Sequence, residues 1–243
     1  MRQLEAVATL ALWQAAEGRP PVQRALVLAA GDGEDPADVV HLPLGRRDAR
    51  LLDLHAALGG RLLEATAECP ACGEPAELSV DPADLAAVEG RAADPRPIEV
   101  DGVVVSWRPL DSDDLLAAAE AGDAASAERV LLSRCVLAAA GSDGEVAATE
   151  LPGRVRDALE RALLAADPLS EVLVGVACPA CGTEFVVDLD VAGFVWAELR
   201  GRARELLRDV HVLARAYGWT ESEVLALGER RRAAYLELAQ EPA

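Results

Sequence analysis

The spacing of apolar positions divides the chain into helical stretches at both ends and shorter, strand-like stretches between them. From 199 to 217 apolar side chains recur every three or four residues, which predicts one face of a long helix that Gly218 terminates. Residues 3–17 follow the same period. The segment 22–30 is short and mostly apolar, so its pattern fits a strand or a helix equally.

Capping residues predict where further helices begin. Asp48 is expected to cap a helix that runs to about Leu58, and Asp111 or Ser112 a helix that runs through Ala119. The segment Thr220-Glu221-Ser222-Glu223 is a capping box. The other predicted helices are 123–139, with Asp123 as its cap, 151–165 and 229–239.

Alternation with a period of two predicts short strands between the helices. The clearest is a hairpin over 98–105, whose Asp101-Gly102 dipeptide favours a type I′ turn. Further strands are expected at 76–80, 171–176 and 184–189. Residues 31–36 and 141–144 are expected to be loops.

One pentapeptide occurs twice, as Cys69-Pro70-Ala71-Cys72-Gly73 and as Cys178-Pro179-Ala180-Cys181-Gly182. Each copy places two thiols on a tight turn, and the glycine permits the positive φ that such a turn needs. A closed, tetrahedral zinc site takes four ligands, and four thiolates can supply all of them. We therefore predict that Cys69, Cys72, Cys178 and Cys181 bind one structural zinc ion per chain.

The two cysteine motifs belong to an internal duplication. Residues 63–85 align with 172–194 without a gap, and in both a strand, an aspartate and a helix start follow the motif. Although 105 residues separate Cys72 from Cys178, the entropy of closing a loop grows only slowly with its length. The metal would thus hold residues 62–85 and 171–194 together, and the chain between them would leave the metal site and return to it.

Other interpretations of the cysteines remain open. A redox centre would place one such motif at a helix start in a βαβ unit, whereas strand-like residues follow both motifs here. The motifs could also fold without metal, or form two sites with other ligands. His41, His55 and His211 lack ligand spacing and are expected at the surface or an interface. Cys135 is expected to be a buried apolar residue.

These patterns predict an α+β protein, mostly helical and organised around a discontinuous four-cysteine zinc ribbon with short antiparallel strands. Its expected parts are an N-terminal helical region (1–60), the ribbon (61–90 plus 168–192), an insertion with a hairpin and helices (91–167), and C-terminal helices (193–243).

The net charge of the chain and the absence of known catalytic motifs argue against several classes of function. The formal net charge of −19 disfavours binding to nucleic acid or anionic membranes, and no apolar run is long enough to span a bilayer. The N-terminus has no signal-peptide layout, so we expect a cytoplasmic protein. The sequence contains no phosphate-binding glycine loop, nucleophile elbow or evident acid–base pair. We expect no enzymatic activity.

Several segments resemble the baseplate hub assembly chaperones of T-even-type phages, whose relatives occur in gene clusters of phage-like contractile injection systems. The similar segments are 194–199, 207–219, 223–227 and 230–236, with 41–49 near the N-terminus. The paired cysteine motifs also occur in bacterial members of the group. The resemblance implies a non-enzymatic chaperone or minor baseplate component, with baseplate and hub proteins as its partners, and leaves open whether it stays in the particle.

Aromatic and arginine side chains in the C-terminal segment are candidates for a partner surface, because both are enriched at binding hot spots. The candidates are Tyr217, Arg231, Arg232 and Tyr235. The alternative function is that of a zinc-ribbon nucleic-acid-binding or regulatory protein, and the acidic net charge argues against nucleic-acid binding.

Overall fold

The computed structural model describes residues 4–31, 33–142 and 144–240. It is 56% helical, with 17% strand in short antiparallel sheets, so the predicted α+β class is confirmed. Residues 1–3, 32, 143 and 241–243 lie outside the described residues. The start of the predicted helix 3–17, one position in each predicted loop and the end of the C-terminal segment fall among them.

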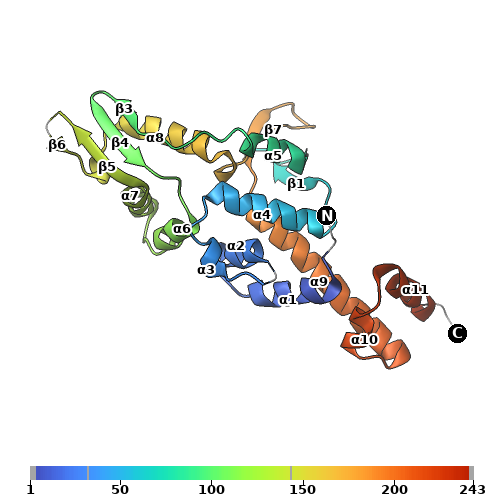
Figure 1. The fold of residues 1–243 in the computed structure, drawn as a ribbon. Coiled ribbons are helices and arrows are strands. Elements are labelled where there is room, and N and C mark those ends of the chain that lie inside the picture. Colours follow the sequence, from blue (N-terminus) through green and yellow to red (C-terminus); the bar gives the residue numbers. More distant parts are fainter. Residues whose placement is uncertain (1–3, 32, 143, 241–243) are drawn as a thin grey trace.

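Helices make up the centre and one end of the molecule (Figure 1). They are α1 (Ala6–Ala16), α2 (Pro21–Ala30), α3 (Pro36–Val39), α4 (Leu44–Ala57), α5 (Pro82–Glu89), α6 (Ser112–Ala119), α7 (Ala124–Cys135), α8 (Gly153–Ala166), α9 (Val191–Tyr217), α10 (Glu221–Leu225) and α11 (Glu229–Gln240), with 3₁₀ turns η1 (Ala148–Glu150) and η2 (Pro168–Ser170). None of the described helices is long and apolar enough to cross a membrane.

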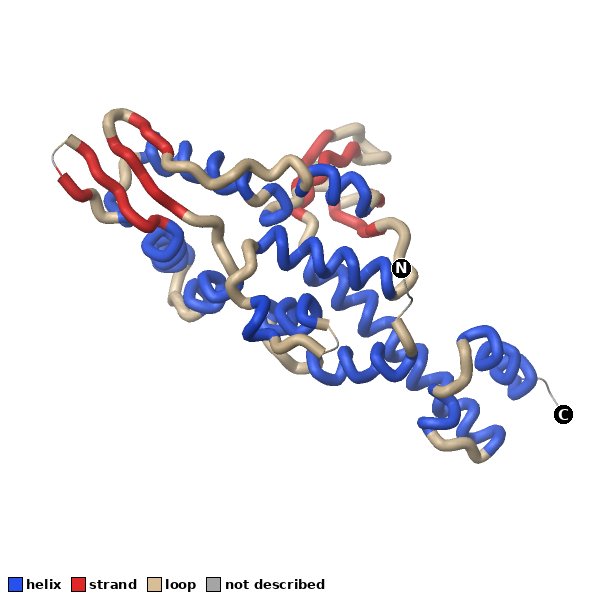
Figure 2. The backbone as a smooth tube through the Cα atoms, in the orientation of Figure 1, coloured by secondary structure: helices blue, strands red, loops and turns tan. Residues whose placement is uncertain are grey.

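The strands form one four-stranded sheet and two separate hairpins (Figure 2). The four-stranded sheet has the order β3 (Ile98–Val100), β4 (Val103–Trp107), β5 (Val136–Gly141) and β6 (Gly144–Glu145). The hairpins are β1 (Leu63–Glu68) with β2 (Pro75–Val80), and β7 (Leu173–Ala177) with β8 (Glu184–Asp188).

The main core joins the N-terminal helices to α9 and to the base of both hairpins. Leu51 from α4 and Leu199 from α9 are fully buried in it, together with Leu63 from β1. The ambiguous segment 22–30 is helix α2, which begins with Pro21 at its first position. Because residues 25–30 of α2 are all buried, no polar face marked the helical period there.

Residues 91–167 form an arm that extends from this core (Figure 1). Val105 and Trp107 of β4 pack against Val155 and Leu159 of α8 in a second apolar cluster. Asp101 and Gly102 both have positive φ, 52° and 77°, as a type I′ turn requires, so the predicted hairpin is confirmed.

Two predictions about helix boundaries are wrong. The helix that Asp123 caps ends at Cys135, because 136–141 pair with β4 as strand β5 instead of continuing to residue 139. Asp48 is not a cap: α4 begins at Leu44, and Asp48 lies buried within it, paired with Arg47. A carboxylate from elsewhere, that of Asp167, accepts a hydrogen bond from the Gly45 N–H at the start of α4.

Candidate metal centre

Each cysteine motif is the turn of an antiparallel hairpin, and the two turns have the same backbone hydrogen bonds. In the first, the Cys69 N–H donates to the Glu74 carbonyl at 3.0 Å and the Gly73 N–H donates to the Cys69 carbonyl at 2.9 Å. In the second, the Cys178 N–H donates to Thr183 at 2.9 Å and the Gly182 N–H to Cys178 at 3.0 Å.

The glycine of each turn has a φ of +75°, a conformation that strains any other residue. Gly73 and Gly182 are therefore required by the turns. The similarity continues beyond the strands, where Asp81 caps α5 and Asp190, 109 positions later, caps α9. This agreement supports the duplication inferred from the sequence.

The two turns face each other and bring the four predicted sulfur atoms together. All four Sγ atoms lie within 4.8 Å of one another. Between the turns, Cys69 Sγ is 3.7 Å from Cys181 Sγ, and Cys72 Sγ is 3.6 Å from Cys178 Sγ. Cys69 and Cys178 are buried, whereas Cys72 and Cys181 are exposed.

These distances fit a metal ion at the centre of the cluster. A tetrahedral zinc ion with Zn–S bonds of about 2.3 Å separates its ligands by about 3.8 Å, whereas the two sulfurs of a disulfide are about 2.05 Å apart. Four sulfur ligands in this arrangement are typical of zinc or of iron. The structure thus supports a metal site formed by Cys69, Cys72, Cys178 and Cys181.

The pKa values of two of the sulfurs are shifted in opposite directions. The Thr183 hydroxyl and backbone lower the pKa of Cys181 to about 6. A backbone hydrogen bond at Glu74 lowers the pKa of Cys72, but contacts with Cys181, Cys178 and Cys69 outweigh it and raise that pKa to about 12. Four thiolates this close repel one another, and a bound divalent cation would remove that repulsion.

No family model, curated protein or solved structure matches this chain.

The environment of the cysteines differs from that of a thioredoxin-type centre. Residues 69–73 and 178–182 connect antiparallel strands, and neither turn begins a helix. Cys135, the fifth cysteine, is buried in the core of the arm, as predicted, and burial raises the pKa of its thiol to about 11. A thiol with so high a pKa is a poor nucleophile near neutral pH.

The histidines occupy three different environments. His41 and His211 are exposed, as expected. His55 is buried, so its predicted surface position is wrong: its Nδ1 lies 2.6 Å from Oε2 of Glu198 on α9, and its ring packs edge-on against Phe194. Because these partners are more than 130 positions from His55, no local pattern could have shown them.

Gly60 closes over the ring of His55, and a Cβ at position 60 would overlap that ring. We expect Gly60→Ala to displace His55 from Glu198 and to lower the free energy of unfolding by about 1–3 kcal/mol. Denaturant unfolding would measure this effect.

Gly201→Ala is a suitable control, because Gly201 lies in α9 with open space around its Cα. Alanine has a higher helix propensity, so this variant should be more stable by about 0.5–1 kcal/mol. A Gly60→Ala protein as stable as the unchanged protein would contradict the steric argument.

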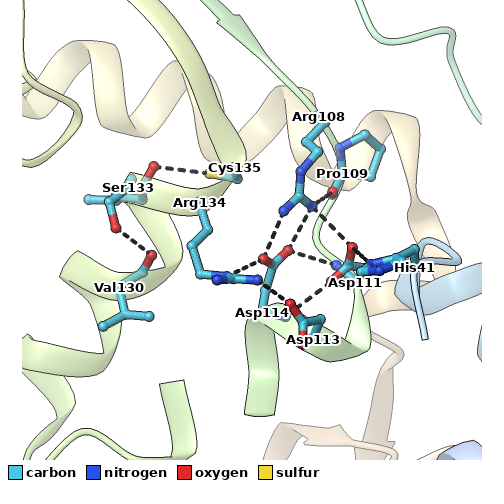
Figure 3. A network of polar contacts seen from close by, with 11 residues as sticks. His41, Arg108, Pro109, Asp111, Asp113, Asp114, Val130, Ser133, Arg134 and Cys135 are labelled. Carbon is cyan, nitrogen blue, oxygen red and sulfur yellow. Dashed lines mark hydrogen bonds and ion pairs between the residues drawn. The ribbon is translucent and has the colours of Figure 1, made fainter. Parts of the chain in front are cut away.

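A polar network at the base of the arm was also absent from the sequence predictions (Figure 3). Asp114 is fully buried and accepts two hydrogen bonds from Arg108, at 2.7 and 2.8 Å, and one from Arg134 at 2.7 Å. Asp111 and Asp114 also form a reciprocal capping box at the start of α6, which confirms Asp111 as the predicted cap. His41 contacts Asp111 at 3.2 Å and links the network to the N-terminal region.

The four candidate partner residues lie where α10 and α11 fold back on α9. Tyr217 stacks on Trp219, and Tyr235 meets both rings edge-on. Arg231 lies over the ring of Tyr235, with its guanidinium carbon 5.7 Å from the ring centroid. Arg232 is buried, and its Nε donates to Asp209 at 3.0 Å, so that its charge is paired within the chain.

Proposed function

We propose that this chain is a non-enzymatic assembly protein of the baseplate or hub of a phage-like contractile injection system. It would act as a chaperone or as a minor baseplate component, in the cytoplasm or within the particle. The observation that carries this proposal is the C-terminal segment, which bears the most specific part of the resemblance. There the segment from Tyr217 to Tyr235 packs as one unit against the end of α9.

The composition of this unit suits a protein that acts by contact. Tyr217 remains partly exposed and Arg231 is exposed beside Tyr235. Such side chains bury large areas at interfaces and make directional contacts there. Within the proposed function, Tyr217, Arg231 and Tyr235 would contact a baseplate or hub protein, while Arg232 would hold α11 against Asp209.

The metal would be one structural zinc ion per chain, held by Cys69, Cys72, Cys178 and Cys181. Because four protein thiolates fill a tetrahedral coordination sphere, no position remains for substrate or water, and the site would serve folding. The bound ion would fix the two hairpins against each other and so set where the arm and α9 leave the ribbon.

The experiment is co-purification of the tagged chain with the sheath, tube and baseplate proteins of its own cells. We expect baseplate or hub proteins to be recovered, and Tyr217→Ala with Arg231→Ala to reduce that recovery. Arg230→Ala, which changes a neighbouring exposed arginine, serves as the control. Normal assembly of particles in a deletion strain, at normal yield, would contradict the proposal.

The alternative, a ribbon that binds nucleic acid, would need a basic surface near the hairpins. Glu64, Glu68 and Glu77 instead lie exposed on the solvent face of β1–β2. Carboxylates there would repel phosphates, which disfavours this function. Salt-sensitive binding of DNA or RNA at physiological ionic strength would revive it.

A further inference from the structure

The two duplicated hairpins differ most on the faces that point to solvent. On β1–β2 the exposed positions include Glu64, Thr66 and Glu77. At the matching positions, 109 residues later, β7–β8 carries Leu173, Gly175 and Val186. The first hairpin shows that this backbone accommodates polar residues at all three positions, so the hairpin fold does not require apolar residues on the second.

Two outward-facing apolar residues of the second hairpin are uncovered. Leu173 is 56% exposed and Val186 is 64% exposed. A Cβ on Gly175, which pairs with Val186 across the hairpin, would have nothing within 4 Å. An open hollow of about 480 Å³ lies here, lined by Gly175, Val176, Ala177, Glu184, Phe185 and Val186.

The outer edge of β8 also has free backbone groups. The ladder contains hydrogen-bonded and non-hydrogen-bonded residue pairs. Two bonds show which pairs are hydrogen-bonded: the Leu189 N–H donates to the Val172 carbonyl, and the Cys178 N–H donates to the Thr183 carbonyl. In an antiparallel ladder these pairs alternate, so the N–H and C=O groups of 184, 186 and 188 point away from β7. Among the described strands β8 pairs with β7 alone, and these groups can therefore accept a further strand.

Charge determines which strand this edge can accept. Glu184 and Asp188 stand two residues to either side of Val186, on the same exposed face. No ion pair is found for either carboxylate among the described residues. If two copies of β8 paired antiparallel about Val186, Glu184 would stand opposite Asp188, and like charges in that position are destabilising. The edge thus disfavours self-association and favours a basic strand.

We propose that the β8 edge binds an extended segment of a partner protein, which adds a strand to the β7–β8 hairpin. The segment has an apolar side chain beside Val186, and arginine or lysine two residues to either side, beside Glu184 and Asp188. Backbone hydrogen bonds would supply affinity and the side chains specificity. The proposal rests on the function above only in assuming a protein partner, and it concerns a different surface.

The test uses the full-length, metal-bound protein and a blocked peptide of sequence Thr-Arg-Thr-Val-Thr-Arg-Thr as the probe. In an extended peptide the valine and both arginines share one face. NMR titration should show saturable binding, with slower hydrogen exchange at the Val186 amide. The same peptide with glutamate in place of both arginines should bind at least about tenfold more weakly.

The matched variant is Val186→Glu, which introduces the residue that the first hairpin carries at the matching position, Glu77. It should fold, retain the metal and lose at least about tenfold in affinity for the peptide. Glu64→Gln with Glu77→Gln changes the exposed face of the first hairpin instead and should leave binding unchanged.

Three results would overturn the proposal. They are the absence of peptide binding, equal binding by the Val186→Glu variant, and dimerisation of the protein through β8 in sedimentation experiments. Co-purification with baseplate proteins is measured separately. If it persists while the peptide does not bind, the edge-strand proposal fails and the proposed function stands.

Discussion

Replacing Cys178 with serine is expected to abolish metal binding and to cause the largest loss of stability of any single change in the ribbon. Cys178 is buried, and its sulfur lies 3.6 Å from that of Cys72 on the opposite turn. Zinc binding to small four-ligand modules is worth roughly 10 kcal/mol or more, and serine is a far weaker ligand than a thiolate. Elemental analysis should find one zinc per unchanged chain and almost none in Cys178→Ser.

Thermal unfolding should show the same loss, and Cys72→Ser should behave like Cys178→Ser because both turns contribute to one site. Cys135→Ala is the control, since it removes a buried thiol far from the cluster. It should keep the metal and cost about 1 kcal/mol through lost packing. Carefully prepared unchanged protein that contains no metal would contradict the metal site itself.

Asp114→Asn is expected to destabilise the arm by about 3 kcal/mol. The substitution keeps the size of the side chain but removes the charge that holds Arg108 and Arg134 together. Hydrogen bonds to charged partners are worth more than neutral ones, and both guanidinium groups would lose their buried counter-ion. Denaturant unfolding monitored within the arm should show the loss, whereas metal content should not change.

Asp113→Asn provides the control, because Asp113 is paired with Arg134 and its side chain is 45% exposed. Its effect on the free energy of unfolding should stay below about 1 kcal/mol.

The pH dependence of stability provides a second measurement of what Asp114 contributes. Although burial raises the pKa of Asp114, hydrogen bonds from Arg108, Asp111 and Arg134 outweigh this and hold it at about 2. The carboxylate therefore stabilises the fold above its ordinary pKa of 3.8, and this stabilisation is lost as the pH falls towards 2. Asp114→Asn should lack this part of the acid dependence.

The features that the sequence predicted well are those with a local cause. The cysteine turns need their glycines, Asp101-Gly102 needs positive φ, and Gly218, with a φ of +72°, ends α9 as expected. The capping box at Thr220 is also confirmed. In each case the residues that decide the conformation lie within four positions of one another, so the signal is contained in a short window.

The features that were missed depend on residues distant in sequence. Nothing near 136–141 shows that this alanine-rich segment is a strand, because its partner β4 decides it. Likewise, the partner of His55 is on α9, and Arg134 is 20 positions from Asp114. The four-cysteine site could be predicted only because metal ligands come in a known number with a recognisable spacing.

The paired turns also have a mechanical consequence. With a metal bound, tension applied to the two segments that flank the ribbon would pass from Cys69 to Cys181 through the metal–sulfur bonds, because these are the first and last ligands along the chain. The 105 residues between Cys72 and Cys178 would carry none of this force. Rupture of the metal site would then release up to about 350 Å of hidden chain length in a single step. The arm is in this sense shielded from load by an ion outside its own core.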